Sequence, residues 1–147
     1  MKNFGLGLLA AAMSLIIAPL ASPAGQDPGR PIEGNQLIDL VVDKTWYGRA
    51  IEGDYTWVEY YAVNGDAFYL DDSGFLAGSW DIIGEREICF DYPELGSFCF
   101  SAFQTPDGQV AIYDLVEERL IHVTTSIAEG DPESLARLPA VGDEVGQ

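Results

Sequence analysis

Residues 86–103 read Arg-Glu-Ile-Cys-Phe-Asp-Tyr-Pro-Glu-Leu-Gly-Ser-Phe-Cys-Phe-Ser-Ala-Phe, and this stretch decides the fold. Apolar and polar residues alternate on both sides of the turn sequence Pro-Glu-Leu-Gly, which is typical of a β-hairpin. With the turn centred on Glu94, Cys89 lies opposite Cys99, so a disulfide is predicted across the hairpin. Because strand side chains alternate between faces, one face of the hairpin is apolar and is expected to be core. That face carries Ile88, Phe90, Phe98 and Phe100.

The first 24 residues have the order of a secretory signal peptide. A basic start at Lys2 precedes an apolar run over residues 4–21 and the small residues 22–24, so cleavage is expected after Ala24. A retained membrane anchor is the alternative, because the run approaches the roughly 20 residues that span a bilayer. Two exported cysteines that can pair fit an oxidising compartment, with buried free thiols as the alternative. We therefore expect a periplasmic or secreted protein that leaves the membrane after signal cleavage.

The remainder of the chain is strongly acidic and long enough for one domain. Removing residues 1–24 from the 147 leaves 123, and it removes one of the seven Lys and Arg residues but none of the 24 Asp and Glu residues. The formal net charge therefore moves from −17 to −18. Such a charge repels nucleic acids and anionic membrane surfaces, so nucleic-acid binding is excluded and a basic envelope protein is a candidate partner.

One helix and a series of short strands are predicted after residue 34. Residues 25–34, rich in proline and glycine, are expected to form a flexible leader. A helix of about two turns is expected from Asn35. Besides the hairpin, strands are predicted at 44–49, 55–63, 67–70, 78–83, 110–116 and 119–127. Strands at such regular spacing favour a small, mainly antiparallel β meander over residues 35–127 that closes into a barrel or sandwich, followed by an acidic, largely disordered tail over 128–147.

The turn at Asn64-Gly65 leaves the register of one hairpin open. This dipeptide is the strongest short signal for a tight turn between two strands. The direct pairing places Tyr61 with Phe68 on one face and Tyr60 with Tyr69 on the other. One added bulge residue would exchange these faces.

The segment Gly74-Phe75-Leu76-Ala77-Gly78-Ser79-Trp80 resembles the Gly-x-Trp strands of lipocalin-like β-barrels, in which glycine lets the backbone bend and tryptophan closes one end. More broadly, residues 35–116 resemble a family of small exported bacterial domains of unestablished function, which implies a periplasmic location. The matching residues are 44–48, 57–61, 78–80 and the Cys89-Phe90 and Cys99-Phe100 pairs. Some chains of this appearance carry the name dihydrodipicolinate reductase. That activity requires a nucleotide-binding βαβ domain and a chain about twice as long. This sequence shows no such domain and is too short.

Aromatic residues are too numerous for one face of a small sheet. Some must either line a cavity and contact a ligand or simply fill a barrel interior. The first hypothesis is non-catalytic binding of an unknown ligand through these aromatic strands, or of a basic protein through the acidic surface. The candidate binding residues are Trp46, Trp57, Glu59, Tyr60, Tyr61 and Tyr69.

The second hypothesis is a small hydrolase or isomerase that needs no cofactor. Glu59 lies among aromatic residues, where burial would raise the pKa of its carboxyl as a general acid requires. The alternatives are that Glu59 is a rim residue or a partner of Arg49. His122, the single histidine, is the other candidate for the catalytic group, with a structural or merely exposed histidine as the alternative. One histidine builds no ordinary zinc site. The mature chain carries no nucleotide-binding or metal motif, so no cofactor, no metal and no assigned catalytic residue are predicted.

Overall fold

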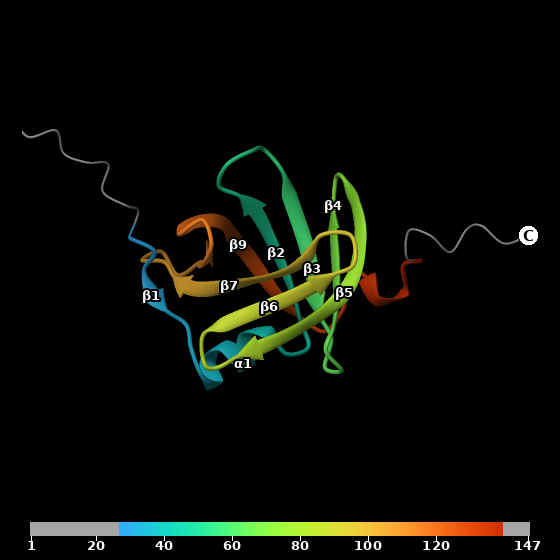
Figure 1. The fold of residues 1–147 in the computed structure, drawn as a ribbon, viewed down its shortest axis with the longest axis horizontal. Helices are drawn as coiled ribbons and strands as arrows, with labels where there is room; N and C mark the ends of the chain where they lie inside the picture. The colour runs from blue at the N-terminus through green and yellow to red at the C-terminus, as the bar shows by residue number, and fades with distance from the viewer. Residues whose placement is uncertain (1–26, 140–147) are drawn as a thin grey trace, which may run out of the picture.

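The computed structural model describes residues 27–139, which form a closed antiparallel β-barrel with one short helix (Figure 1). The predicted fold class is confirmed, and the barrel alternative holds over the sandwich. The barrel strands are β2 (Lys44–Ala50), β3 (Thr56–Tyr61), β4 (Asp66–Asp71), β5 (Gly74–Ile83), β6 (Glu87–Tyr92), β7 (Gly96–Gln104), β8 (Val110–Asp114) and β9 (Arg119–Glu129).

The barrel is an up-and-down meander, since each strand from β2 to β9 pairs antiparallel with the next one along the chain. Pairing of β9 with β2 closes the ring, so these eight strands leave no open edge in the sheet. Eight strands enclose an interior just wide enough to be filled by side chains or to hold one small ligand.

The hairpin of β6 and β7 has the predicted register. Cys89 pairs with Cys99 and forms a disulfide, and Phe90 pairs with Phe98. Ile88 and Phe90 are buried, so the apolar face points into the barrel and the disulfide lies on its outer side. The cross-link and the core contact therefore stabilise the same two strands from opposite faces.

Helix α1 (Asn35–Val41) covers one end of the barrel, at the bottom of Figure 1. Leu37 and Val41 are fully buried, and Trp46 Nε1 donates a hydrogen bond of 2.7 Å to the carbonyl oxygen of Leu40. This end is therefore closed by apolar contacts and by a direct bond between helix and barrel. Within residues 27–139, no helix is long and apolar enough to cross a membrane.

Two segments outside the predicted β domain are more ordered than expected. The leader contributes β1 (Arg30–Pro31), which pairs with β7, and Ile32 is only 2% exposed. At the other end, β9 continues to Glu129, and the 3-10 helix η1 (Leu135–Arg137) buries Leu135 completely. Isolated apolar residues in these polar stretches thus complete the core. The predicted signal segment and residues 140–147 of the predicted tail lie outside the described residues.

A bulge at Gly65 sets the register of the β3–β4 hairpin. Gly65 has a φ of 91°, its amide donates to the carbonyl oxygen of Ala62, and Asp66 pairs back to Ala62. The extra residue shifts the pairing so that Tyr61 lies opposite Ala67 and Tyr60 opposite Phe68. Trp57, Glu59 and Tyr61 alternate along β3 and point into the barrel, and the shifted pairing places Tyr69 of β4 on the same face.

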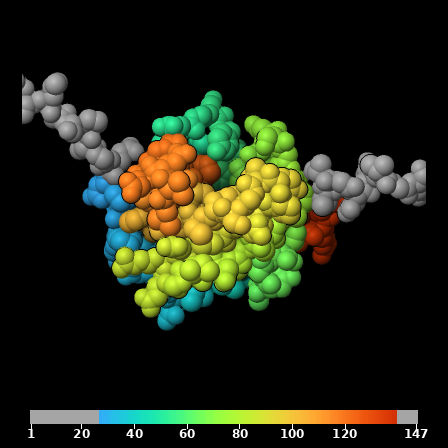
Figure 2. Space-filling view, in the orientation of Figure 1, coloured from blue at the N-terminus to red at the C-terminus, as the bar shows by residue number. Residues whose placement is uncertain are grey.

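The end of the barrel opposite α1 forms an open mouth. Four connections surround it, formed by residues 51–55, 72–73, 93–95 and 115–118. In the space-filling view, β5, β6 and β7 close the front, and a hollow lies at the upper edge between these connections (Figure 2). Since α1 covers the other end of the barrel, we take this mouth as the entrance to the interior.

Candidate functional site

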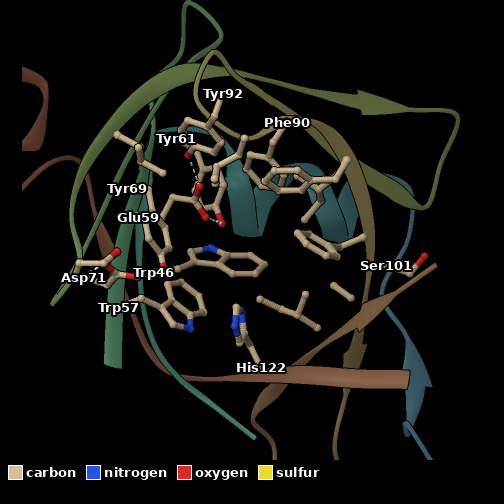
Figure 3. Close-up of a pocket in the computed structure, with 18 residues that line it drawn as sticks. Trp46, Trp57, Glu59, Tyr61, Tyr69, Asp71, Phe90, Tyr92, Ser101 and His122 are labelled. Carbon is tan, nitrogen blue, oxygen red and sulfur yellow. Dashed lines mark hydrogen bonds between the residues drawn. The ribbon is translucent and has the colours of Figure 1, made fainter. Parts of the chain in front are cut away.

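A cavity of about 290 Å³ lies inside the barrel beneath the mouth (Figure 3). Its wall is mainly aromatic and aliphatic, with a few polar groups. Trp46 lies next to α1 at the closed end, and the side chain of Trp57 lies beside His122, nearer the mouth. The other lining residues include Glu59, Tyr61, Tyr69, Asp71, Leu76, Ile88, Phe90, Tyr92, Leu95, Phe98, Phe100, Ala102 and Ile112.

Two glycines make room for the large rings. A Cβ added to Gly48 would lie 2.2 Å from the Trp57 ring, so the indole can lie directly over β2. A Cβ added to Gly78 would lie 2.7 Å from Cδ1 of Tyr92 and 2.3 Å from the Asp91 carbonyl oxygen. Because Gly78 is small, Tyr92 can extend from β6 across β5 toward β3.

Glu59 is a carboxylate buried on the cavity wall, with only 7% of its surface exposed. Its Oε2 accepts a hydrogen bond of 2.9 Å from the Tyr61 hydroxyl, and its Oε1 accepts one from the Tyr92 hydroxyl (Figure 3). Removal from water raises the pKa of this carboxyl to about 7, although the two tyrosine hydrogen bonds favour the ionised form and act in the opposite direction. Glu59 is therefore poised to gain or lose a proton near neutral pH.

Trp57 brings an unused hydrogen-bond donor to the wall. Its indole N–H is buried and has no partner among the described residues, whereas the N–H groups of Trp46 and Trp80 donate to Leu40 and Ala62. A buried donor without an acceptor costs free energy. An acceptor atom on a bound molecule would satisfy it.

His122 and Tyr55 lie at the mouth. The Tyr55 hydroxyl and His122 Nε2 are hydrogen-bonded at 2.9 Å, and the imidazole lies 5.3 Å from the Trp57 ring, centroid to centroid. Burial lowers the pKa of His122 to about 4, so the imidazole is neutral at physiological pH. Its role at the mouth is therefore that of a neutral polar group, not a cation.

Tyr69 and Asp71 complete the polar part of the wall. The Tyr69 hydroxyl donates to Asp71 Oδ2 at 2.8 Å, while Asp71 Oδ1 accepts from the Ser73 hydroxyl and amide. These hydrogen bonds outweigh partial burial and lower the pKa of Asp71, while burial and the nearby carboxylate raise the pKa of Tyr69. Asp71 is thus a fixed negative charge near the mouth.

The structure brings five of the six candidate binding residues to the cavity: Trp46, Trp57, Glu59, Tyr61 and Tyr69. Tyr60 was assigned wrongly, because side chains alternate between the two faces of a strand and Tyr60 lies between Glu59 and Tyr61, which both point into the barrel. On the outer face the Tyr60 hydroxyl donates to Asp43 and the Tyr60 ring stacks on Phe68. Burial together with Asp43 raises the pKa of Tyr60 to about 12. Glu59 contacts two tyrosines and has no bond to Arg49.

Sequence reasoning did not assign Tyr92 to the site. It is 33 positions from Glu59 in the chain, and the two meet only because the barrel closes around the cavity. Tyr92 follows Phe90 by two residues and therefore lies on the same apolar face of the disulfide-linked hairpin. This spacing could have placed Tyr92 inside the barrel.

No cavity residue forms a metal site. The cluster with suitable spacing among residues 27–139 is Glu87, Cys89 and Cys99 on the outer face. Its two sulfurs are joined in the disulfide, so they are not available as thiolate ligands.

The fold and site together define a closed eight-stranded barrel with a mostly apolar internal cavity. No family model matches the chain, and neither the curated proteins nor the solved structures include a match.

Proposed function

We propose that this protein is an exported, non-catalytic binding protein that encloses a small, mainly apolar ligand inside its barrel. The observation that carries the proposal is the cavity: aromatic walls, one closed end, one open mouth and a few inward-facing polar groups. Sites for small ligands are concave, mostly apolar, and contain a small number of placed polar groups that fix orientation.

The size of the cavity limits the ligand. An apolar cavity of about 150 Å³ accommodates benzene. A volume of about 290 Å³ therefore suits a molecule roughly twice that size, such as a single or fused aromatic ring with a short side chain. Long lipid chains would exceed it.

Three polar groups would orient this ligand. The Trp57 N–H offers a donor, Glu59 offers a carboxyl group, and His122 borders the entrance. Polar groups in a dry interior are unfavourable when they lack hydrogen-bond partners. A ligand that forms hydrogen bonds with these three groups therefore gains affinity as well as a fixed orientation.

We propose that the protein is exported because Cys89 and Cys99 form a disulfide. Such cross-links persist in oxidising compartments such as the periplasm. The acidic surface remains available to a basic envelope protein. In that case the association rate should fall steeply with added salt, and an unchanged rate would count against such a partner.

The indole N–H signals in a ¹H–¹⁵N spectrum test ligand binding directly. Titration with 2-naphthol and 2-phenylethanol is expected to shift the free Trp57 N–H signal, while the bonded Trp46 and Trp80 signals move less. Ala102→Leu places extra atoms in the cavity and should weaken binding about tenfold or more. Ala77→Leu, on the outer side of β5 opposite Phe68, is the matched control.

The decisive result is the difference between these two variants. If Ala102→Leu and Ala77→Leu bind the probes equally, the barrel interior is not the binding site. Leu76→Phe provides a second filled cavity should Ala102→Leu unfold. Saturating concentrations of both probes without any change in the Trp57 signal would also overturn the proposal.

A second candidate function is acid–base catalysis by Glu59. The observation in its favour is the pKa of about 7, which is near the optimum for a group that both takes and gives a proton. Incubation of wild type and Glu59→Gln with cavity-binding compounds, followed by mass spectrometry, separates the two functions. A product formed by wild type and not by the variant would establish catalysis, and an unchanged ligand supports simple binding.

A further inference from the structure

The inference concerns the chemical class of the ligand and rests on the proposed function. Glu59 is a buried carboxylate without a cationic partner: none of the ion pairs within residues 27–139 includes it, and no Lys or Arg lines the cavity. A carboxylate has about four acceptor positions on its two oxygens, and the two tyrosine hydroxyls occupy only two of them. Glu59 can therefore accept further hydrogen bonds from a donor inside the cavity.

The surroundings of Glu59 favour a positively charged donor. Aromatic rings attract cations to their faces, and this attraction is strongest where water is excluded. Trp46 lies opposite Glu59 on β2, Tyr69 lies opposite it on β4, and Phe90 and Tyr92 approach from β6. A cation bound here would contact a carboxylate and aromatic rings together.

The mouth carries the charge that such a ligand would meet first. Arg119, which directly follows the last of the four connections that surround the mouth, forms ion pairs with Glu52 and Glu117. The mouth is still negatively charged, because the connections themselves contain six acidic residues and no basic one. These are Glu52, Asp54, Asp72, Glu94, Glu117 and Glu118. Like-charged groups around an opening raise the local concentration of oppositely charged molecules and repel anions. Asp71 adds a further negative charge just inside.

We propose that the ligand is a small aromatic amine in its protonated form, with its ammonium group bound to the Glu59 carboxylate and its ring against the aromatic wall. Anionic compounds such as aromatic carboxylates would place a second negative charge beside Glu59 and are excluded. Neutral compounds fit the space but leave the carboxylate without a counter-charge.

Only one group in the cavity changes charge in the range where this binding would be measured. The groups that face Glu59 are Tyr61 on its own strand, Tyr69 from β4 and Tyr92 from β6, and burial raises the pKa of all three tyrosines above their usual value. At the mouth, His122 stays neutral above pH 5 and Asp71 stays ionised. Affinity for the ammonium ion should therefore fall about tenfold for each pH unit below 7, as Glu59 becomes protonated.

The test compares 2-phenylethylamine with 2-phenylethanol, which have the same size and differ in charge. Calorimetric titration of wild type at pH 8 is expected to give at least about tenfold tighter binding of the amine. Glu59→Gln should remove most of this preference while still binding the alcohol. Glu85→Gln, an exposed carboxylate near the closed end, is the control and should keep the preference.

The outcomes separate this inference from the proposed function. If the alcohol binds as tightly as the amine, or if Glu59→Gln keeps the preference, the ligand class is wrong although the cavity binds ligands. If neither compound binds, and Ala102→Leu behaves as wild type with 2-naphthol, both conclusions fail. Amine affinity that does not change between pH 5 and pH 8 would likewise overturn the role of Glu59.

Discussion

Replacing Glu59 by glutamine should change the pH dependence of stability in a defined direction. The folded protein holds this carboxyl at a pKa of about 7, compared with 4.5 as its ordinary value. The folded state thus binds the proton more tightly than the unfolded chain does. Stability from this group is therefore fully present below pH 4.5 and is lost as the pH rises to 7.

The magnitude follows from the two pKa values. Each pH unit between them corresponds to about 1.36 kcal/mol, so ionising the buried carboxyl lowers the free energy of unfolding by about 3 kcal/mol at pH 8. Glutamine has a similar shape and cannot ionise. Because tyrosine hydroxyls can donate or accept, Tyr61 and Tyr92 can still hydrogen-bond to the amide.

Urea denaturation from pH 4 to pH 9, with the disulfide intact and tryptophan fluorescence as the signal, measures the effect. The quantity to plot is the free energy of unfolding of Glu59→Gln minus that of wild type, because the subtraction removes the contributions of the other acidic residues. This difference should rise by about 3 kcal/mol between pH 4.5 and pH 7 and then level off. Glu85→Gln should give a flat line.

A Glu59→Gln difference that stays constant from pH 5 to pH 8 would refute the reasoning. It would mean that Glu59 ionises as easily in the barrel as in the unfolded chain. The carboxylate would then be hydrated, and the cavity would not be the dry, aromatic site described above.

Three further predictions concern other parts of the barrel. His122→Asn should gain stability relative to wild type as the pH falls from 6.5 toward 4, measured by the same urea series, because the fold keeps this imidazole neutral while the unfolded chain takes up a proton. Replacing both Cys89 and Cys99 by serine should cost about 2.5–3 kcal/mol in the free energy of unfolding, as expected for closing a loop of this length, and an unchanged urea midpoint would contradict it. Gly78→Ala should cost about 1–3 kcal/mol and displace the Tyr92 ring, visible as a changed near-ultraviolet circular dichroism spectrum, whereas an unaltered spectrum would count against the close packing.

Much of the fold could be predicted because local signals agreed with one another. The alternation around the Pro-Glu-Leu-Gly turn set the register of Cys89 and Cys99, and a one-residue slip would have exposed the phenylalanines. Regular strand spacing then implied a meander. Closure into a ring depends on contacts between β2 and β9, which lie far apart in the chain, so barrel and sandwich could not be separated in advance.

Part of the site could be predicted from the sequence, and part could not, because it depends on the form of the turn at Asn64-Gly65. Asn-Gly supports both a tight two-residue turn and a longer turn with a bulge. Here the Asn64 side chain accepts a hydrogen bond from the Asp66 amide, and Gly65 alone adopts positive φ, which is the bulged form. The bulged form places Tyr69, and not Phe68, on the same face of the sheet as Glu59 and Tyr61. Nothing in the local sequence decides between the two forms.

The loss of folding stability that ionised Glu59 causes in the ligand-free barrel indicates which kind of ligand the cavity binds. Above pH 7 an ionised carboxylate in this position lowers stability, and an apolar or amide side chain would pack there without that loss. A cation that enters the cavity reverses the effect, because it favours the same ionised form that the empty fold disfavours. The free protein and the complex should therefore differ in the proton bound at Glu59 near neutral pH. Binding of 2-phenylethylamine at pH 6.5 should release protons to the buffer, whereas binding of 2-phenylethanol should not, and calorimetry in buffers of different ionisation enthalpy distinguishes the two.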